Sequence, residues 1–178
     1  NVVYYGARSG ALTVSPNVST ILYRIGPGGD VDGDGYSDVL LRAASSSNAY
    51  SWFRGGASGI ATTSSADLGW GGSGFPSPHP CGVGDIDGDG YGDWGVAEEG
   101  SALNSVFVFR GGPSPGTTPF WTGTMPSAPA TCTWGDWNRD GFSDIAMAAI
   151  PGAATPRTDA FLGATTTAAI DASVTHPG

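Results

Sequence analysis

Asp30-Val-Asp-Gly-Asp-Gly-Tyr-Ser-Asp38 places carboxylates at positions 1, 3, 5 and 9 of a nine-residue segment. The pattern returns without gaps as Asp85-Ile-Asp-Gly-Asp-Gly-Tyr-Gly-Asp93 and as Asp136-Trp-Asn-Arg-Asp-Gly-Phe-Ser-Asp144, and we call the three segments loops 1, 2 and 3. The loops begin 55 and 51 residues apart. Because periods of this size are typical of propellers, solenoids or arrays, three copies of one structural unit are expected.

A second motif recurs in phase with the loops: an aromatic-rich segment that ends in glycine. Its copies are residues 3–6, 51–55, 107–111 and 159–163. In each full repeat the glycine follows the first Asp of the loop by 25 to 27 residues. Aromatic and β-branched residues favour strands, and the many Gly and Pro residues mark turns. Each repeat therefore predicts four short strands, which is the content of one propeller blade.

The expected strands of a repeat lead into the loop, leave it, carry the aromatic motif and close the blade. Examples are residues 21–25 for the first, 38–42, 93–97 and 144–149 for the second, and 116–122 for the fourth. The expected fold is an all-β propeller, with residues 1–20 as two strands of an incomplete blade and blades at 21–72, 73–127 and 128–178. About three and a half blades are too few to close a ring. We therefore expect either a fragment of a longer propeller or several chains that complete one.

The acidity of the chain is local. Its formal net charge is −9, all seven basic residues are Arg, and 11 of the 16 acidic residues lie in the loops. This distribution indicates metal sites rather than a general anionic surface. No basic patch exists to displace counterions, so nucleic acid is not an expected partner. No apolar run approaches the length that crosses a bilayer, so membrane insertion is not expected.

The loop pattern fits Ca²⁺, a hard cation that takes six to eight oxygen ligands. Carboxylates at positions 1, 3 and 5 converge on one point, and glycine at position 6 permits the sharp turn. Position 7 offers its backbone carbonyl, so its aromatic side chain is free to pack into the core, and position 9 is a candidate bidentate ligand. The predicted ligands are Asp30, Asp32, Asp34, Tyr36 and Asp38; Asp85, Asp87, Asp89, Tyr91 and Asp93; and Asp136, Asn138, Asp140, Phe142 and Asp144.

Loop 3 differs from the other two because Asn138 stands at position 3 and Arg139 follows it. Its ligand charge is −3 rather than −4, so it is expected to bind calcium most weakly. In every loop, neighbouring carboxylates raise one another's energy when no cation is present. Three structural Ca²⁺ ions are therefore expected to order the hairpins and to stabilise the fold by mass action.

Three alternative assignments of the loops fit the pattern less well. An EF-hand or dockerin loop needs an oxygen ligand at position 12, where this chain has Leu41, Val96 and Met147. A metal-free Asp/Gly turn is common, but three copies in phase with four converging ligands disfavour it. Mg²⁺ is disfavoured because it prefers to keep its water in a rigid octahedron.

With both motifs in order three times, the chain resembles the FG-GAP repeat, which builds the β-propeller of integrin α subunits and of many bacterial secreted proteins. The resemblance covers nearly the whole chain. It implies a propeller, usually of seven blades, with calcium in the hairpin loop between the first two strands of a blade. One departure is that Gly82-Val-Gly84 and Trp134-Gly135 stand where the Phe-Gly of the family is expected.

Catalytic machinery is not evident. His79 and His176 are expected in exposed, Pro-flanked loops without a nucleophile partner, and the Glu98–Glu99 pair is expected in an exposed turn. The chain is therefore expected not to be an enzyme. Cys81 and Cys132 each lie four residues before a loop. Two buried thiols and a disulfide between neighbouring blades both remain open, since spacing alone does not show whether the Cα atoms come within about 7 Å.

The expected function is a calcium-stabilised module for recognition or adhesion, secreted or on the cell surface. Its partner would be an extracellular protein or a glycan, and the segments 45–48, 98–104 and 151–157 are the expected contact loops. One alternative is a carbohydrate-binding propeller, for which Trp70 and Trp121 are the candidates for exposure. The second alternative is an accessory domain of a secreted hydrolase. The chain begins at Asn1 without a visible signal peptide, as a mature or excised piece of a precursor would.

Overall fold

The computed structural model contains only strands and turns in the parts of the chain that it describes, so the predicted all-β class is confirmed. It describes residues 4–5, 13–14, 22–43, 50–61, 66–67, 79–98, 104–125, 129–149, 157–166 and 170–177. Within these residues no helix is long and apolar enough to cross a membrane.

Three antiparallel four-stranded sheets follow one another along the chain. Sheet 1 contains β3 (Leu22–Gly29), β4 (Asp38–Ala43), β5 (Tyr50–Phe53) and β6 (Ala66–Asp67). Sheet 2 contains β7 (His79–Gly84), β8 (Asp93–Glu98), β9 (Asn104–Phe109) and β10 (Trp121–Met125). Sheet 3 contains β11 (Pro129–Gly135), β12 (Asp144–Ala149), β13 (Arg157–Leu162) and β14 (Asp171–Pro177). Strands β1 (Tyr4–Tyr5) and β2 (Thr13–Val14) form a separate pair.

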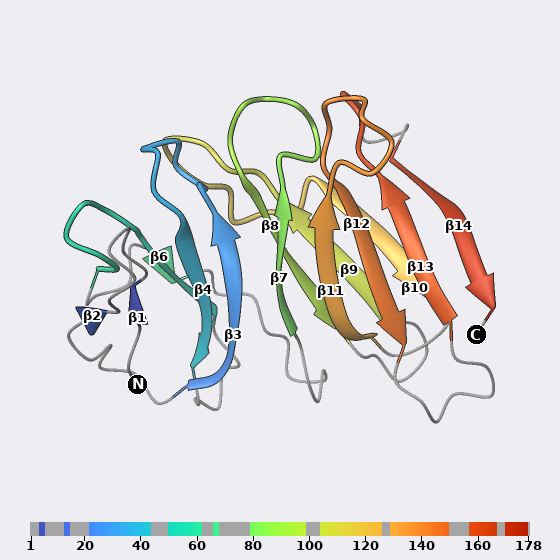
Figure 1. Ribbon diagram of the computed structural model, residues 1–178. Helices are drawn as coiled ribbons and strands as arrows, with labels where there is room; N and C mark the ends of the chain where they lie inside the picture. Colours follow the sequence, from blue (N-terminus) through green and yellow to red (C-terminus); the bar gives the residue numbers. More distant parts are fainter. Residues whose placement is uncertain are drawn as a thin grey trace.

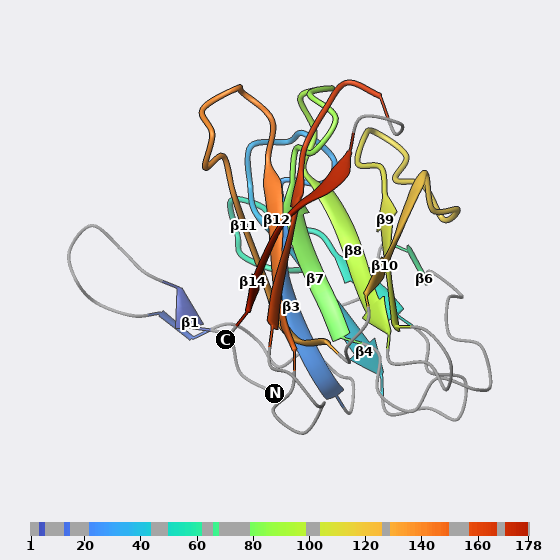
Figure 2. The same ribbon diagram turned by 90° about the vertical axis from the view of Figure 1, so that its right-hand side faces the viewer.

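The sheets are arranged as a fan (Figure 1), in which the first strands β3, β7 and β11 are neighbours. Seen from the side of β14, the sheets lie one behind another (Figure 2). In each sheet the spatial order of the strands is their order in the chain. This arrangement is consistent with consecutive blades of a propeller.

Two strands differ from their predicted bounds by more than one residue. Strand β3 continues to Gly29 and so reaches the loop, beyond the expected end at residue 25. Strand β10 begins at Trp121 rather than at residue 116. The reason is a turn between β9 and β10, in which Gly116 donates a backbone hydrogen bond to the Arg110 carbonyl at 2.9 Å.

The core lies between the sheets because alternate residues of a strand face opposite sides. Trp94 of β8 stacks on Phe109 with ring centroids 3.9 Å apart and belongs to the cluster between sheets 1 and 2. Ala97 of the same strand belongs to the next cluster, where Ile145 and Met147 of sheet 3 are fully buried. Sheet 2 is therefore buried on both faces.

A disulfide joins Cys81 of β7 to Cys132 of β11, with Cα atoms 6.0 Å apart. Of the two alternatives that the sequence leaves open, this pairing is the one in the structure. It ties the first strands of sheets 2 and 3 together, and Cys81 itself is fully buried.

Glycine is required where the first strands approach one another. A Cβ on Gly82 would lie 2.5 Å from the Pro27 carbonyl oxygen of β3, whereas a Cβ on Gly116 would have no neighbour closer than 3.6 Å. We expect Gly82→Ala to lower the free energy of unfolding by about 1–3 kcal/mol, the usual cost of overpacking. Gly116→Ala, as the matched control, is expected to change it by less than about 0.5 kcal/mol. Urea unfolding of both variants measures the difference, and equal midpoints would contradict a close approach of the two strands at Gly82.

Candidate metal centre

Each acidic loop joins the first two strands of its sheet, and all three lie at the same end of the fan, at the top of Figure 1. The position 6 glycines have the positive φ that the sequence predicts: 87° at Gly35, 92° at Gly90 and 92° at Gly141. Position 4 is also left-handed, with φ of 77° at Gly33 and 76° at Gly88. In loop 3 this position is Arg139, with φ of 62°.

Carboxylates at positions 1 and 5 hold the backbone of the loop. The Asp85 carboxylate accepts hydrogen bonds from the amides of Gly88 at 2.7 Å, Asp89 at 3.0 Å and Gly90 at 2.9 Å. Asp89 Oδ1 in turn accepts from the Tyr91 amide at 2.9 Å. These bonds curl the loop around its own acidic side chains.

The position 9 carboxylate connects the loop to the aromatic strand. Asp93 accepts a hydrogen bond from the Ile86 amide at 3.1 Å and another from the Gly111 amide at 2.9 Å. Asp38 does the same with Val31 and Gly55. The bond to the glycine of the aromatic motif gives a physical reason for the narrow range of spacing between the two motifs. Each position 9 oxygen still has a lone pair for a cation, because a carboxylate accepts about four bonds.

Burial makes the ionised position 9 carboxylates of loops 1 and 2 unfavourable without a cation. Desolvation raises the pKa of Asp93 to about 7, against the lowering effect of its two backbone hydrogen bonds. Desolvation also raises the pKa of Asp38. A nearby cation stabilises the charged form of such groups.

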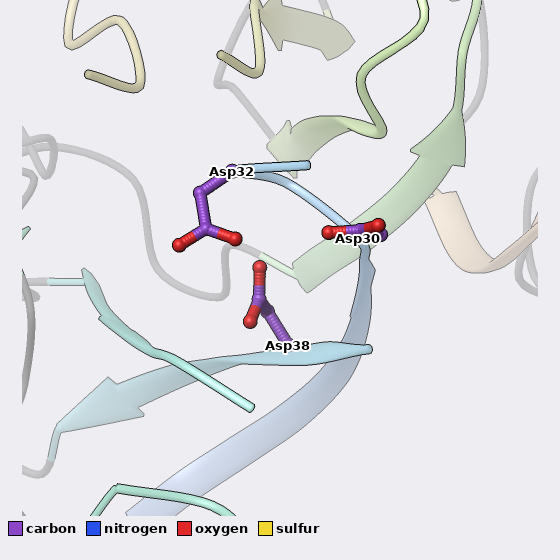
Figure 3. A group of neighbouring side chains, drawn as sticks. All are labelled: Asp30, Asp32 and Asp38. Carbon is purple, nitrogen blue, oxygen red and sulfur yellow. The ribbon is translucent and has the colours of Figure 1, made fainter. Parts of the chain in front are cut away.

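Two groups of three carboxylates converge: Asp30, Asp32 and Asp38 in loop 1, and Asp85, Asp87 and Asp93 in loop 2. Within each group, one oxygen from every residue lies within 4.8 Å of the others. Figure 3 shows Asp32 and Asp38 turned toward each other with Asp30 beside them.

The converging carboxylates fit a hard cation. Asp30 Oδ1 and Asp87 Oδ1 are buried without a hydrogen-bond partner, a situation that costs free energy unless a ligand satisfies the oxygen. Oxygen-only donor sets of this kind suit Ca²⁺, Mg²⁺ or Mn²⁺. The acidic clusters of loops 1 and 2 can therefore hold a metal ion.

Two arginines take part in these clusters, and reasoning from the sequence did not find them. Arg54 forms an ion pair with Asp32, and Arg110 Nε lies 2.6 Å from Asp87 Oδ2. The side chains of both aspartates are only 4% exposed. Each arginine directly precedes the glycine of the aromatic motif, where the third repeat has Leu162. The sequence therefore contained a signal for these ion pairs. The residue before the motif glycine is Arg in the two repeats with Asp at loop position 3, and it is Leu in the repeat with Asn at that position.

Loop 3 is organised differently. Asn138 Nδ2 donates to Asp140 Oδ2 at 2.8 Å, and the Asn138 side-chain oxygen accepts from the Asp140 amide at 3.0 Å. Asp144 keeps the position 9 role and accepts from the amides of Trp137 and Gly163. Among the described residues, loop 3 does not form a convergent group of three acidic side chains.

The position 7 side chains are not in the core, contrary to expectation. Tyr36 is 44% exposed. The rings of Tyr91 and Phe142 lie against Gly33 and Gly88, the position 4 glycines of the preceding loop. The expectation was wrong because it considered each loop alone, whereas the neighbouring loop provides the surface that these rings cover.

The two histidines and the glutamate pair lie elsewhere than the sequence predicts. His79 begins β7 and His176 lies in β14, so neither is in a loop. Arg24 Nη1 lies 2.8 Å from His79 Nδ1. Glu98 ends β8 and is fully buried rather than in an exposed turn, because the strand continues through it; Glu99 lies outside the described residues.

The predicted contact surface is mostly not described. The structure does not describe Trp70 or most of the three expected contact segments. Trp121 is partly buried and packs edge-on against Phe161, with ring centroids 5.1 Å apart. The exposed tryptophans among the described residues are Trp134 and Trp137, at 43% and 50%. Trp134 lies in β11 just before loop 3, and Trp137 is position 2 of loop 3 itself.

Comparison with known proteins agrees with the repeat. The family model described as an FG-GAP-like repeat matches residues 30–96 and again residues 85–147. The two matches together span more than half of the chain, and each includes two acidic loops. A search of the curated proteins found no match.

Proposed function

This chain belongs to the FG-GAP-like repeat family, and from that premise we propose that it is a propeller module whose hairpin loops bind structural Ca²⁺. The observation that carries this proposal is the pair of convergent acidic clusters with buried, unpartnered oxygens at Asp30 and Asp87. Calcium is favoured over Mg²⁺ because the loops offer many protein oxygens in a flexible shell. The proposed ligands are the side chains at positions 1, 3, 5 and 9 and the carbonyl at position 7 of each loop.

Equilibrium dialysis tests the metal sites. We expect the wild-type chain to bind at least two Ca²⁺ ions. Their dissociation constants should be roughly 10⁻⁴–10⁻³ M, as in extracellular modules. Asp87→Ala removes a ligand of loop 2 and should lower the stoichiometry by one. Glu99→Gln removes an equal charge outside the loops and should leave it unchanged. Binding of less than one ion by the wild type, or equal losses in the two variants, would overturn the proposal.

We propose further that the module acts outside the cell in recognition or adhesion. The Cys81–Cys132 disulfide supports this location, because disulfides persist mainly in oxidising compartments. Calcium is plentiful there, so weak sites would be filled. Repeat domains of this family are typically structural or binding modules, and we propose a non-catalytic role here too. Further blades, from a longer chain or from other copies, would complete the ring.

A glycan is one candidate ligand, favoured by the exposed rings of Trp134 and Trp137, since exposed aromatic faces can stack on sugars. We expect the calcium-loaded chain to bind members of a glycan array and Trp137→Ala to lose that binding. Ile25→Ala, a change at an apolar residue that is 62% exposed in β3, serves as the control. Binding only to immobilised extracellular proteins would favour the protein-ligand function instead.

A further inference from the structure

Neighbouring loops are joined by backbone hydrogen bonds that repeat along the fan. The amide of Gly92, at position 8 of loop 2, donates to the carbonyl of Asp30, at position 1 of loop 1, at 2.7 Å. The amide of Ser143 in loop 3 donates to the carbonyl of Asp85 in loop 2, also at 2.7 Å. The first ligand residue of loops 1 and 2 is therefore held by the loop that follows it.

A second bond comes from the residue directly after the aromatic motif of the following sheet. Gly112 donates to the Val31 carbonyl at 2.7 Å, and Ala164 donates to the Ile86 carbonyl at 2.9 Å. Val31 and Ile86 occupy position 2 of loops 1 and 2, and both are fully buried. Positions 1 and 2 of these loops thus have their carbonyls fixed from the next sheet.

An aromatic ring completes the contact. A Cβ on Gly33 would lie closer than 3.0 Å to the ring of Tyr91, and a Cβ on Gly88 would lie equally close to the ring of Phe142. Each ring therefore rests on the backbone between the position 3 and position 5 carboxylates of the preceding loop. Any side chain at position 4 would displace it, so Arg139 cannot receive a further ring in the same way.

We propose that the metal sites of neighbouring loops are thermodynamically coupled, with Tyr91 and Phe142 as the positioning residues that order the loop preceding their own. The proposal rests on the calcium function proposed above. A loop ordered by its own ion holds its ring and position 8 amide in place, so the preceding loop loses less conformational freedom when it binds. Coupling between two binding sites is reciprocal, so each site should change the affinity of the other by the same factor.

The ring can be separated from the ligand set of its own loop. Tyr91 is proposed to contribute only its backbone carbonyl to loop 2, whereas its ring contacts loop 1. Removing the ring should therefore weaken loop 1 and, because the lost coupling is shared by both sites, weaken loop 2 as well. A purely local role for Tyr91 predicts a weaker loop 2 and an unchanged loop 1.

Calcium titration followed by amide NMR of the full chain resolves the loops one by one. The Gly35 amide donates to Asp30 Oδ2 and the Gly90 amide donates to Asp85 Oδ2, each at 2.9 Å, so the two amides report on loops 1 and 2. We expect Tyr91→Ala to raise the calcium midpoint of Gly35 roughly fivefold or more, the lower end of ordinary coupling. The Gly90 midpoint should rise as well, because reciprocal coupling is lost from both sites together.

Four further variants complete the test. Tyr91→Phe keeps the ring and should behave as the wild type, since loop 3 uses Phe at this position. Tyr36→Ala removes the exposed ring of loop 1 and should leave the Gly90 midpoint unmoved. Asp87→Asn disables loop 2 and should raise the Gly35 midpoint, while Asp32→Asn should raise the Gly90 midpoint by the same factor.

The two proposals fail in different ways. Glycine amides that do not respond to calcium in the wild type overturn the calcium function, and the coupling with it. Loops that respond while Tyr91→Ala and Asp87→Asn leave Gly35 unmoved overturn the coupling alone. A Tyr91→Ala effect confined to Gly90 would show a local role for the ring and would also overturn it.

Discussion

A melting temperature lower by about 10 °C is expected when EGTA replaces 2 mM calcium, on the estimate of roughly 2 kcal/mol for each of two sites at about 10⁻⁴ M affinity. The physical reason lies in loops 1 and 2. Without a cation, buried carboxylates such as Asp38 and Asp93 are desolvated and close to other acidic groups, and burial raises their pKa. A bound ion relieves this unfavourable arrangement only in the folded chain, so it stabilises folding by mass action.

Differential scanning calorimetry measures this change in melting temperature. Two controls test whether it comes from calcium bound in the loops. Magnesium at the same concentration should restore less than half of the difference, because Mg²⁺ dehydrates reluctantly. The double variant Asp32→Asn/Asp87→Asn, which keeps only loop 3, should lose most of the difference between calcium and EGTA. A wild-type melting curve that is the same in EGTA and in calcium would contradict a structural role for the ion.

Loss of the disulfide is expected to lower the free energy of unfolding by about 4 kcal/mol, from the chain-entropy model for cysteines separated by 51 residues. The bond restrains the unfolded chain across most of one repeat, and in the folded chain it joins β7 to β11. Urea unfolding of Cys81→Ala/Cys132→Ala against the oxidised wild type measures the loss. Alanine is the substitution of choice because Cys81 is fully buried and a serine hydroxyl there would add a desolvation cost.

Reduction provides the matched comparison. The wild type in reductant should unfold at nearly the same urea concentration as the double variant, and the double variant should not respond to reductant. The oxidised wild type should show no free thiol when unfolded. Two free thiols in that assay, or a double variant as stable as the oxidised protein, would be incompatible with the disulfide or with its role.

The repeat and the strand class could be predicted because their signals are local. Spacing at Asp30, Asp32, Asp34 and Asp38, with glycine at position 6, acts within nine residues and determines a turn of one shape. Aromatic and β-branched runs between Gly and Pro clusters determine strands in the same way. Such rules were inaccurate only at the ends of strands. Strand β10, for example, begins at Trp121, because the preceding residues up to Phe120 form a turn although their composition resembles that of a strand.

A second group of features depends on contacts with a neighbouring sheet. Rules that consider only nearby residues in the sequence cannot predict such contacts. The disulfide, the ion pairs of Arg54 and Arg110, and the burial of Glu98 all require knowledge of which strands lie side by side. Most plainly, Tyr36 and Tyr91 hold the same position in nearly identical loops, yet one ring is exposed and the other covers Gly33 of the preceding loop. The sequence by itself determined the shape of each loop, because hydrogen bonds within nine residues decide it, and the number of copies, because the motif occurs three times. Only the tertiary structure decided how one loop meets the next, because that contact joins residues more than fifty positions apart.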